Sequence, residues 1–419
     1  GQFLYGLNGI SEIGIDSDDG QHIFLTVFDQ RQIGAGDTIY QIVSQIERPA
    51  VIAGKQDRRF DTTLLINGLP IIQIEEKKDT HDVNEALNQM HQYIEENQYR
   101  DIFSTVQILV AITPNNVKYM ANTTADKFNK DFAFNWQRKS DNSIVRNWKE
   151  FADSMLSIPM AHQMATNYMI LDGTKNKQML KVMRPYQVYA TQEVIEGLKK
   201  VDFEMGANKV GYIWHTTGSG KTITSFKTAW LASRMPKIDK VVFVVDRIAL
   251  TNQTTENYQA YDPDGASKKD DGKIFDTKNT TDLSRKLKSK ENGIIITSVQ
   301  KLNTLINRKS FKSPEKNIVF VVDEAHRSTG GSSFSDIQKA FKRAAWVGYT
   351  GTPMFDDMGK EVRTEDVFGR LLHAYTIREA IADRNVLGFK VDFETTSSEE
   401  EMKENYLPAF YRERYPMWS

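Results

Sequence analysis

The central part of the chain alternates short apolar runs with longer amphipathic segments. The runs have strand length and cover residues 211–215, 240–247, 292–299, 317–326 and 344–353. Their centres, such as VVFVV and GIII, are almost continuously apolar, which is typical of strands buried on both faces of a parallel sheet. The segment TITSFKTAWLASR, between the first two runs, has helical spacing. This alternation predicts a doubly wound parallel α/β sheet whose ligand binds at the carboxyl ends of the strands.

A second pattern, near the start of the chain, predicts a β-hairpin. The strand-like runs TTLLI and PIIQIEE flank the turn sequence NGL. With a three-residue loop, Asp61 lies opposite Glu75 and on the same face of the sheet. Side chains alternate along the second strand, so Lys77 joins that face. Glu76 and Lys78 form an alternative acidic and basic pair on the opposite face.

Two carboxylates and a lysine on one face can form a Mg²⁺-dependent phosphodiesterase site. Asp61 and Glu75 are the candidate metal ligands and catalytic residues, because a bound metal polarises a phosphate and lowers the pKa of bound water. Lys77 is the third candidate, since its ammonium group can position water and offset developing charge. The competing interpretation is a hairpin with a solvated, charged end, and the short D…ExK pattern alone favours it.

The segment DVNEALNQMHQYIEEN, which follows the hairpin, predicts an amphipathic helix. Its apolar residues Val83, Leu87 and Met90 recur at helical spacing. Gln89 and Tyr93 are four residues apart and therefore lie on one helix face. They are either a polar pair beside the carboxylates or a surface glutamine and a half-buried tyrosine on a packing helix.

The stretch HTTGSGKT, residues 215–222, ends like a phosphate-binding loop but begins with His where the usual pattern has Gly. Glycines allow the tight turn that directs backbone N–H groups at a phosphate. Lys221 would reach the outer phosphates of ATP, and the Thr222 hydroxyl would bind Mg²⁺. The predicted ATP-binding residues of this loop are Thr217, Gly218, Ser219, Gly220, Lys221 and Thr222.

The carboxylates in VVFVVDEAH complement this loop. Asp323 can hold the Mg²⁺ of ATP through water, and Glu324 can activate the attacking water as a catalytic base. Alone, the loop could be a glycine turn and the two acids a solvated strand end. Their occurrence together at the ends of two strands favours an ATPase.

Composition narrows the class of protein without identifying it. The chain has 419 residues, no Cys and a formal net charge of −1. The lack of Cys excludes disulfides and Cys nucleophiles and fits a reducing cytosol. No apolar run is long enough to cross a bilayer, and we expect no membrane partner. The first residue is Gly, and we expect the sequence to be a piece of a longer protein.

The central motifs resemble those of superfamily 2 helicases and translocases. HTTGSGKT, VVDRIALTNQ, TSVQKL, VVDEAHRS and GYTGTPM occur in the order of motifs I, Ia, Ib, II and III of that superfamily. The resemblance implies a nucleic-acid-driven ATPase with RecA-like lobes, in which Thr350, Gly351 and Thr352 couple the nucleotide to the nucleic acid. RPYQ resembles the adenine-contacting Q motif, with Gln187 as the reader. A polar residue at a helix start is the alternative role for Gln187.

The hairpin resembles the PD-(D/E)xK nuclease pattern. A Q-x-x-x-Y sequence follows the ExK strand in one nuclease branch, where the pair corresponding to Gln89 and Tyr93 supports DNA contact or metal geometry. Nucleases of this type carry a further acidic residue in an N-terminal segment, and none is found ahead of Asp61. Asp57 is a candidate substitute for it.

A nuclease of this pattern followed by such a motor resembles the restriction subunit of type I restriction–modification enzymes, over most of the chain. The resemblance implies ATP and Mg²⁺ as cofactors and a prokaryotic, cytoplasmic enzyme that pulls double-stranded DNA and cleaves it far from an unmethylated site. It implies the methylation and specificity subunits as partners. It also implies a restriction-endonuclease-like mixed sheet (1–172), a RecA-like first lobe (173–360) and a linker with the start of a second lobe (361–419).

The resemblance is incomplete at the C-terminal side. A full motor needs a second lobe with an arginine finger, and only residues 354–419 follow GYTGTP. Loss of such an arginine costs roughly 10³–10⁵ in rate, so we expect this chain alone to bind ATP but to hydrolyse it weakly. Two other classes stay open: a helicase with a non-catalytic N-terminal DNA-binding domain, and an ATP-gated scaffold. Lys221 and Glu324 argue against the scaffold.

Overall fold

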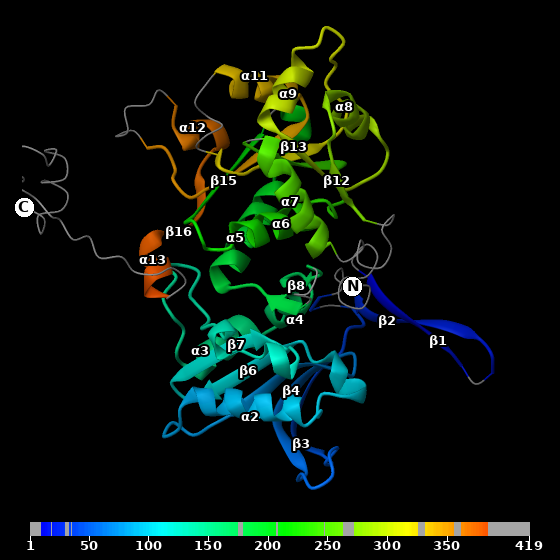
Figure 1. Cartoon of the computed structure of the whole chain (residues 1–419), viewed down its shortest axis with the longest axis vertical. Coiled ribbons are helices and arrows are strands. Elements are labelled where there is room, and N and C mark those ends of the chain that lie inside the picture. Colours follow the sequence, from blue (N-terminus) through cyan, green and yellow to red (C-terminus); the bar gives the residue numbers. More distant parts are fainter. Residues whose placement is uncertain are drawn as a thin grey trace, which may run out of the picture.

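The computed structural model shows two bodies stacked along the long axis of the molecule (Figure 1). It describes residues 10–17, 19–29, 33–34, 36–174, 179–206, 208–246, 248–262, 272–325, 332–355 and 362–383. The later part of the expected second lobe, from residue 384 on, lies outside the described residues. So do Arg247 of the expected motif Ia and residues 326–328 of the expected motif II.

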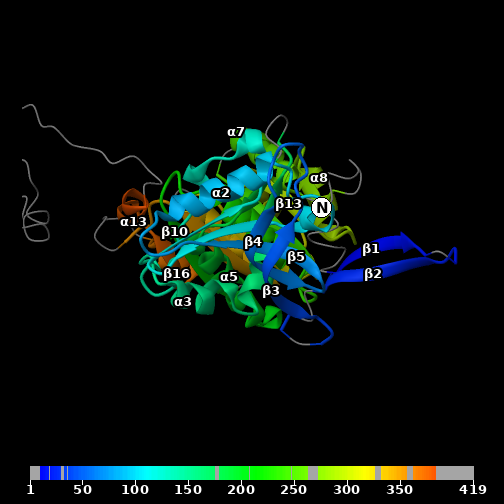
Figure 2. The same ribbon diagram turned by 90° about the horizontal axis from the view of Figure 1, so that it is seen from below.

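The N-terminal body is built on a mixed sheet. Its elements are β3 (Tyr40–Arg48), β4 (Arg58–Ile66), β5 (Leu69–Glu76), α2 (Val83–Glu95), β6 (Ile108–Thr113) and β7 (Asn116–Ala121). The five strands pair in chain order, antiparallel except for β5 and β6, which are parallel. Helix α2 makes the crossover between those two, because parallel neighbours cannot be joined by a tight turn. The strands β1 (Ile10–Asp16) and β2 (His22–Asp29) form a separate hairpin that extends away from this body (Figures 1 and 2).

Helix α2 confirms the amphipathic helix that the sequence predicts. Asp82 caps its N-terminus and Glu85 bonds back to the cap, which satisfies two backbone N–H groups reciprocally. The buried face of the helix carries Val83, Ala86, Leu87, Met90 and Tyr93, and it packs on the sheet.

The turn between β4 and β5 differs in detail from the prediction. It has two residues rather than three, because Asn67 and Gly68 both adopt positive φ, at 52° and 78°, as a tight hairpin turn requires. Strand β5 then carries one extra residue, Ile71, at a β-bulge. The bulge restores the register that a three-residue loop would have produced, so Asp61 still comes opposite Glu75.

Short elements join the two bodies. They are η3 (Ala125–Lys127), η4 (Lys130–Phe132), α3 (Trp148–Phe151), η5 (Ala152–Leu156), α4 (Met160–Ala165), β8 (Met169–Asp172) and β9 (Met179–Val182). The remaining short helix, η2 (Asp101–Thr105), lies between α2 and β6 in the N-terminal body. Strands β8 and β9 pair in an antiparallel hairpin.

The second body is the doubly wound sheet expected from the apolar runs. Its elements are α5 (Pro185–Lys199), η6 (Phe203–Met205), β10 (Asn208–His215), α6 (Lys221–Ala232), β11 (Lys240–Val245), α7 (Ile248–Tyr261), β12 (Ile274–Asp276), α8 (Thr280–Lys288), β13 (Ile294–Ser298), α9 (Val299–Ile306), β14 (Ile318–Val322), α11 (Ser332–Ala340), β15 (Ala344–Thr350), α12 (Thr364–Phe368), β16 (Leu371–Tyr375) and α13 (Ile377–Ala382). Seven parallel strands follow the order β12-β13-β11-β14-β15-β10-β16. Helices α5, α6 and α7 cover one face, and α8, α9, α11 and α12 cover the other.

Strand β16 corrects the expected end of the first lobe. We predicted that this lobe ends near residue 360, yet β16 pairs in parallel with β10 at the edge of the same sheet. The sequence LLHAY is only five residues long and is interrupted by His373, so it does not stand out as a strand. It needs only one neighbour, because it lies at the sheet edge.

One apolar core runs through both bodies. The face of the N-terminal sheet opposite α2 and the layer of α5, α6 and α7 belong to a single cluster of buried side chains. Trp136 lies at the joint, with ring centroids 5.7 Å from Tyr119 in β7 and 5.6 Å from Tyr189 in α5. The Tyr119 hydroxyl donates to the Met183 carbonyl at 2.9 Å, just ahead of α5. Among the described helices, none combines the length and apolar character needed to cross a membrane.

This joint yields a test of the shared core. We expect Trp136→Ala to lower the free energy of unfolding by about 3–5 kcal/mol, because it opens a cavity where the bodies meet. Trp148→Ala is the matched control, since Trp148 is 42% exposed, and it should cost less than about 1 kcal/mol. Urea denaturation measures both variants. Equal losses for the two would contradict a core shared by the bodies.

Candidate active sites

The phosphate loop connects the end of β10 to the start of α6. Gly218 and Gly220 have φ of 81° and 80°, a left-handed conformation that glycine adopts without steric cost. Ser219 closes the turn by donating from Oγ to the Thr216 carbonyl at 2.6 Å. Helix α6 begins at Lys221, so its positive N-terminal end faces the loop. The structure therefore brings the predicted residues 217–222 into an anion-binding turn.

Two side chains from the start of α5 hold this loop. The Tyr186 hydroxyl donates to the Ser219 carbonyl at 2.7 Å, and Gln187 Nε2 donates to the same carbonyl at 3.1 Å. Gln187 Oε1 accepts from the Arg184 backbone N–H at 2.9 Å. A Cβ on Gly220 would lie only 2.6 Å from Gln187 Nε2, so this close approach requires glycine. Gln187 thus has the helix-start role and supports the loop, while adenine reading stays a prediction.

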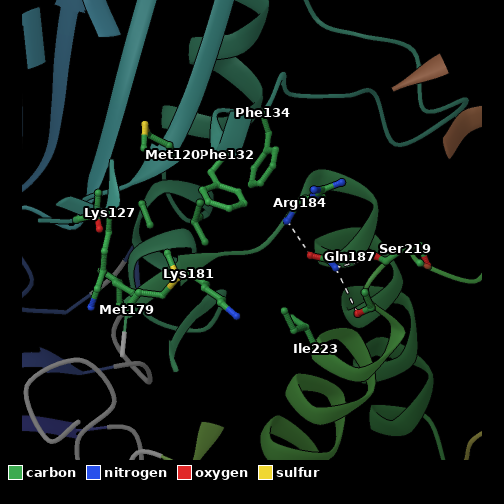
Figure 3. Close-up of a pocket in the computed structure, with 16 residues that line it drawn as sticks. Met120, Lys127, Phe132, Phe134, Met179, Lys181, Arg184, Gln187, Ser219 and Ile223 are labelled. Carbon is green, nitrogen blue, oxygen red and sulfur yellow. Dashed lines mark hydrogen bonds between the residues drawn. The ribbon is translucent and has the colours of Figure 1, made fainter. Parts of the chain in front are cut away.

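A cavity of about 300 Å³ lies between the loop and the N-terminal body (Figure 3). Phe132 and Phe134 line one side of it, and Gln187 and Ile223 line the other. The Arg184 guanidinium carbon lies 4.4 Å from the centroid of the Phe134 ring. A mainly apolar slot with a few polar groups beside a phosphate loop can hold a planar base.

The two acids after β14 lie on the other side of the loop. Asp323 follows the strand directly, and its N–H donates to the Val244 carbonyl at 2.9 Å. Burial and the adjacent Glu324 raise the pKa of Asp323 to about 6, and Lys221 partly offsets this. Glu324 has φ of 50°, which is rare for a residue with a side chain and indicates local strain at this position. Asp323, Glu324 and Thr222 line one cavity of about 230 Å³.

The predicted coupling motif lies against the same loop. The Trp214 indole N–H donates to the Gly351 carbonyl at 3.1 Å, and the Thr352 N–H donates to Thr350 Oγ1 at 3.1 Å. A Cβ on Gly351 would lie 3.4 Å from Lys221 Nζ. The motif therefore lies close to Lys221, the lysine predicted to reach the phosphates, as the predicted coupling role requires.

The hairpin brings the predicted nuclease residues together in a second place. The Asp61 N–H donates to Glu75 Oε1 at 3.4 Å, and Asp61 Oδ2 accepts from the Glu76 N–H at 3.0 Å. Glu75 is fully buried. Burial and the neighbouring Asp61 carboxylate raise the pKa of Glu75 to about 8, and the nearby Lys77 acts in the opposite direction. Two carboxylates held this close repel each other until a cation or a proton joins them.

The remaining predicted nuclease residues form a chain of hydrogen bonds that leads to Glu75. Lys77 Nζ donates to Gln89 Oε1, and Gln89 Nε2 donates to the Tyr93 hydroxyl. The Tyr93 hydroxyl lies 3.5 Å from Glu75 Oε2 and 3.2 Å from the Arg59 carbonyl. Gln89 and Tyr93 are therefore a polar pair beside the carboxylates, and Tyr93 is buried rather than half-buried.

The alternatives weighed for this site lie elsewhere. Glu76 is on the opposite face, where its Oε1 accepts from Thr62 Oγ1 at 2.8 Å, and Lys78 is exposed. Asp57 accepts from the Ala50 N–H at 2.8 Å and so closes the loop before β4, while its role as a substitute acid stays a prediction. In the part of the chain that the structure describes, no three His, Asp or Glu side chains gather as a metal cluster.

Comparison with known proteins decides the family. Residues 186–414 match the family model for the SWI2/SNF2 ATPase. The chain belongs to the SWI2/SNF2 ATPase family. Residues 8–128 match the model for the type I restriction enzyme R protein N terminus. The resemblance to restriction subunits that the motifs indicate is thereby confirmed.

Curated relatives of this SWI2/SNF2 ATPase are endonuclease subunits. The chain is 36% identical over 391 residues to the type I restriction enzyme SauCOLORF180P endonuclease subunit of Staphylococcus aureus (strain COL), covering 92% of the chain and 39% of the relative. It is 36% identical over 386 residues to the SsaAORF53P endonuclease subunit of Staphylococcus saprophyticus, with 90% and 39% covered. The chain thus spans about two fifths of the length of these relatives.

A solved SWI2/SNF2 ATPase core from Sulfolobus solfataricus, in complex with double-stranded DNA, resembles the chain more distantly. The TM-score is 0.33 at 16% identity, over 46% of this chain and 34% of that chain. A TM-score this low supports no statement about the fold or the sites of this chain.

Several residues of the ATPase site were missed at the sequence level. His373 Nδ1 lies 3.1 Å from Nε2 of His215, the first residue of the loop, and both side chains are buried. Burial lowers the pKa of His215 well below its usual range and that of His373 to about 4, so both rings are neutral at pH 7. Tyr186 stands inside the quoted RPYQ motif and could have been found there. His373 carries no such signal, because only the pairing of β16 with β10 brings it near.

The pKa of Glu75 yields a test of the nuclease site. Between pH 4.5 and 8 the unfolded chain ionises Glu75 while the folded chain keeps it protonated, so stability falls as pH rises through that window. The Glu75→Gln substitution removes the titrating group and with it this loss of stability. In metal-free buffer we expect it to raise the free energy of unfolding at pH 8 by on the order of 2–4 kcal/mol, and at pH 5 by much less.

Glu76→Gln is the matched control, because it makes the same change one residue away on the exposed face. Its stability should stay within about 0.5 kcal/mol of the parent at both pH values. Urea denaturation at pH 5 and pH 8 measures the two variants. A Glu75→Gln protein that is less stable than the parent at pH 8 contradicts the buried, proton-holding carboxylate pair.

Proposed function

We propose that the chain is the nuclease and first motor lobe of a type I restriction endonuclease subunit. In this proposal ATP hydrolysis pulls double-stranded DNA, and a Mg²⁺-dependent nuclease cuts it far from an unmethylated recognition site. The observation that carries the proposal is the hydrogen-bonded chain from Lys77 through Gln89 and Tyr93 to Glu75, in the same polypeptide as an ATPase core.

The nuclease site fits a divalent cation. Asp61 and Glu75 would hold Mg²⁺. Burial and the repulsion from Asp61 raise the pKa of Glu75, and a cation at this place would offset both. When bound, the metal supplies charge for the phosphate and a more acidic water. Lys77 places a positive charge beside the carboxylates, and Gln89 fixes its direction. Tyr93 holds Gln89 in turn, so the ammonium group is oriented before substrate arrives.

In this proposal each group that faces the phosphates of ATP has a role. Lys221 and the N–H groups of residues 217–222 hold the phosphates, while Thr222 and Asp323 would hold the Mg²⁺ of ATP. Glu324 accepts the proton of the attacking water. Gln187 and the cavity of Figure 3 receive the base, and Thr350, Gly351 and Thr352 pass the nucleotide state to DNA.

The relatives are endonuclease subunits of type I restriction enzymes, which supports a place for the chain in a larger complex. Methylation and specificity subunits would join the chain in the complete enzyme, in a bacterial cytoplasm. The proposed division is a nuclease (1–172), a first motor lobe (173–360, extended by β16 and α13) and a linker toward the second lobe.

The full-length parent, assembled with its partner subunits, tests the proposal. DNA with an unmethylated site is incubated with ATP and Mg²⁺, and cleavage and phosphate release are measured in the same reaction. Lys77→Ala should lower cleavage at least about 10²-fold and leave ATP hydrolysis within about twofold. Lys221→Ala should lose both activities, because cleavage depends on translocation.

Lys78→Ala is the matched control, since Lys78 is an exposed lysine next to Lys77. It should retain both activities. Cleavage by Lys77→Ala at the parental rate would remove the nuclease assignment and leave a helicase with a non-catalytic N-terminal domain.

A further inference from the structure

The strand and helix that end the first lobe, β16 and α13, contact both the phosphate loop and the N-terminal body. Strand β16 is the edge strand beside β10, and α13 lies next to the N-terminal body (Figure 1). No catalytic motif maps to this segment, residues 371–383. Its contacts nevertheless reach the first two residues of the phosphate loop.

The contacts on the loop side are both backbone and side-chain bonds. The Thr216 N–H donates to the Tyr375 carbonyl at 2.9 Å, which extends the sheet ladder into the loop. The buried His215 and His373 rings are joined at 3.1 Å. The Tyr375 ring also stacks on Tyr186, with centroids 3.6 Å apart and planes within 8°. Because the Tyr186 hydroxyl binds the Ser219 carbonyl, Tyr375 touches the loop by two routes.

The contacts on the N-terminal side converge on one carboxylate. Asp383, which ends α13, accepts at Oδ2 from the Tyr375 hydroxyl at 2.7 Å and from Gln137 Nε2 at 2.6 Å. Asn142 Nδ2 donates to the Ala374 carbonyl at 2.9 Å. The Tyr189 hydroxyl in α5 donates to the Gln137 carbonyl at 2.6 Å. One oxygen of Asp383 therefore joins the edge strand of the ATPase sheet to the N-terminal body.

This arrangement has the features of a positioning device. Gln137 is buried, and its Oε1 has no hydrogen-bond partner among the described residues, so its side chain is held by the bond from Nε2 to Asp383. The path from the loop through Tyr375 and Asp383 to Gln137 consists of direct contacts throughout. Coupling between distant sites is carried by continuous networks of this kind, and its existence must be shown by coupling measurements.

We propose that residues 371–383 are a latch that transmits the state of the phosphate loop to the nuclease body, with Tyr375 and Asp383 as positioning residues. The proposal rests on the proposed function, because it supplies the link between ATP use and DNA cleavage. A shift of the loop on nucleotide binding moves Tyr375, and Asp383 carries that displacement to the segment around Gln137.

The test uses the full-length subunit assembled with its partners on DNA with an unmethylated site. Gln137→Leu removes the donor to Asp383 at nearly constant volume, and Tyr375→Phe removes the other donor while keeping the stacked ring. For each we expect cleavage events per ATP hydrolysed to fall about 5- to 30-fold, a range typical of coupling between sites. The KM for ATP and the maximal rate of hydrolysis should stay within about twofold.

Lys139→Ala is the matched control for losing a contact between the bodies. Lys139 forms an ion pair with Glu193 of α5 at 2.6 Å and is half exposed, next to the latch but outside it. Its cleavage-to-ATP ratio should equal that of the parent. If Gln137→Leu and Tyr375→Phe also keep the parental ratio, or lose both activities in proportion to a loss of stability, the latch is excluded.

A second readout does not depend on activity. Hydrogen exchange of peptides covering residues 137–144 is measured in the isolated full-length subunit with and without ATP. ATP should slow exchange there in the parent and in Lys139→Ala, and leave it unchanged in Asp383→Ala. A response that persists in Asp383→Ala overturns the latch. Failure of the proposed function gives a different result. The Lys77→Ala variant would then cleave DNA at the parental rate, while the latch variants would still show a lowered ratio of cleavage to ATP hydrolysis.

Discussion

The continuous apolar core between the N-terminal sheet and the α5, α6 and α7 layer is the constraint on which the other features depend. A parallel sheet must be covered on both faces, and here one covering layer is itself packed against a second sheet. Trp136 and Tyr189 therefore place the start of α5 at the boundary between the bodies. Since Tyr186 and Gln187 hold the phosphate loop from that helix start, the loop lies at the same boundary. Both the cavity of Figure 3 and the latch follow from this placement.

The two candidate sites share an electrostatic design. In each, a buried carboxylate stands beside a second carboxylate, and its pKa is raised, to about 8 for Glu75 and about 6 for Asp323. A lysine near each one, Lys77 or Lys221, offsets only part of the cost. Such pairs destabilise the metal-free fold, and a cation bound at either place would recover that stability. The left-handed backbone of Glu324 adds local strain, which lowers the stability of the fold at the ATPase site further.

The sequence predicted what depends on local periodicity. Apolar runs located the central strands, helical spacing located α2 and α6, and glycines located the phosphate loop. The opposition of Asp61 and Glu75 was predicted correctly from a loop length that is wrong, because the bulge at Ile71 compensates for the shorter turn. The alternation of side chains then placed Lys77 with the carboxylates.

What remained beyond prediction depends on contacts between distant segments. Strand β16 is only five residues long and lies at the sheet edge, so nothing local marks His373 or Tyr375. The bonds from Gln187 Nε2 to the Ser219 and Gly220 carbonyls could not be predicted from RPYQ, since they require the packing of α5 against α6. Asp383 and Gln137 are 246 positions apart and meet only in the folded chain.

The histidine that replaces the usual first glycine of the loop is a local sequence feature that depends on a contact between distant segments. His215 is the last residue of β10, where the backbone is extended and glycine has no conformational advantage. The position is enclosed by Tyr186, whose ring centroid lies 5.3 Å away, and by His373 on β16. An imidazole fills this space and forms a bond to the edge strand that glycine cannot make. The departure from the common loop pattern is therefore the side chain that ties the phosphate loop to the segment leading out of the lobe.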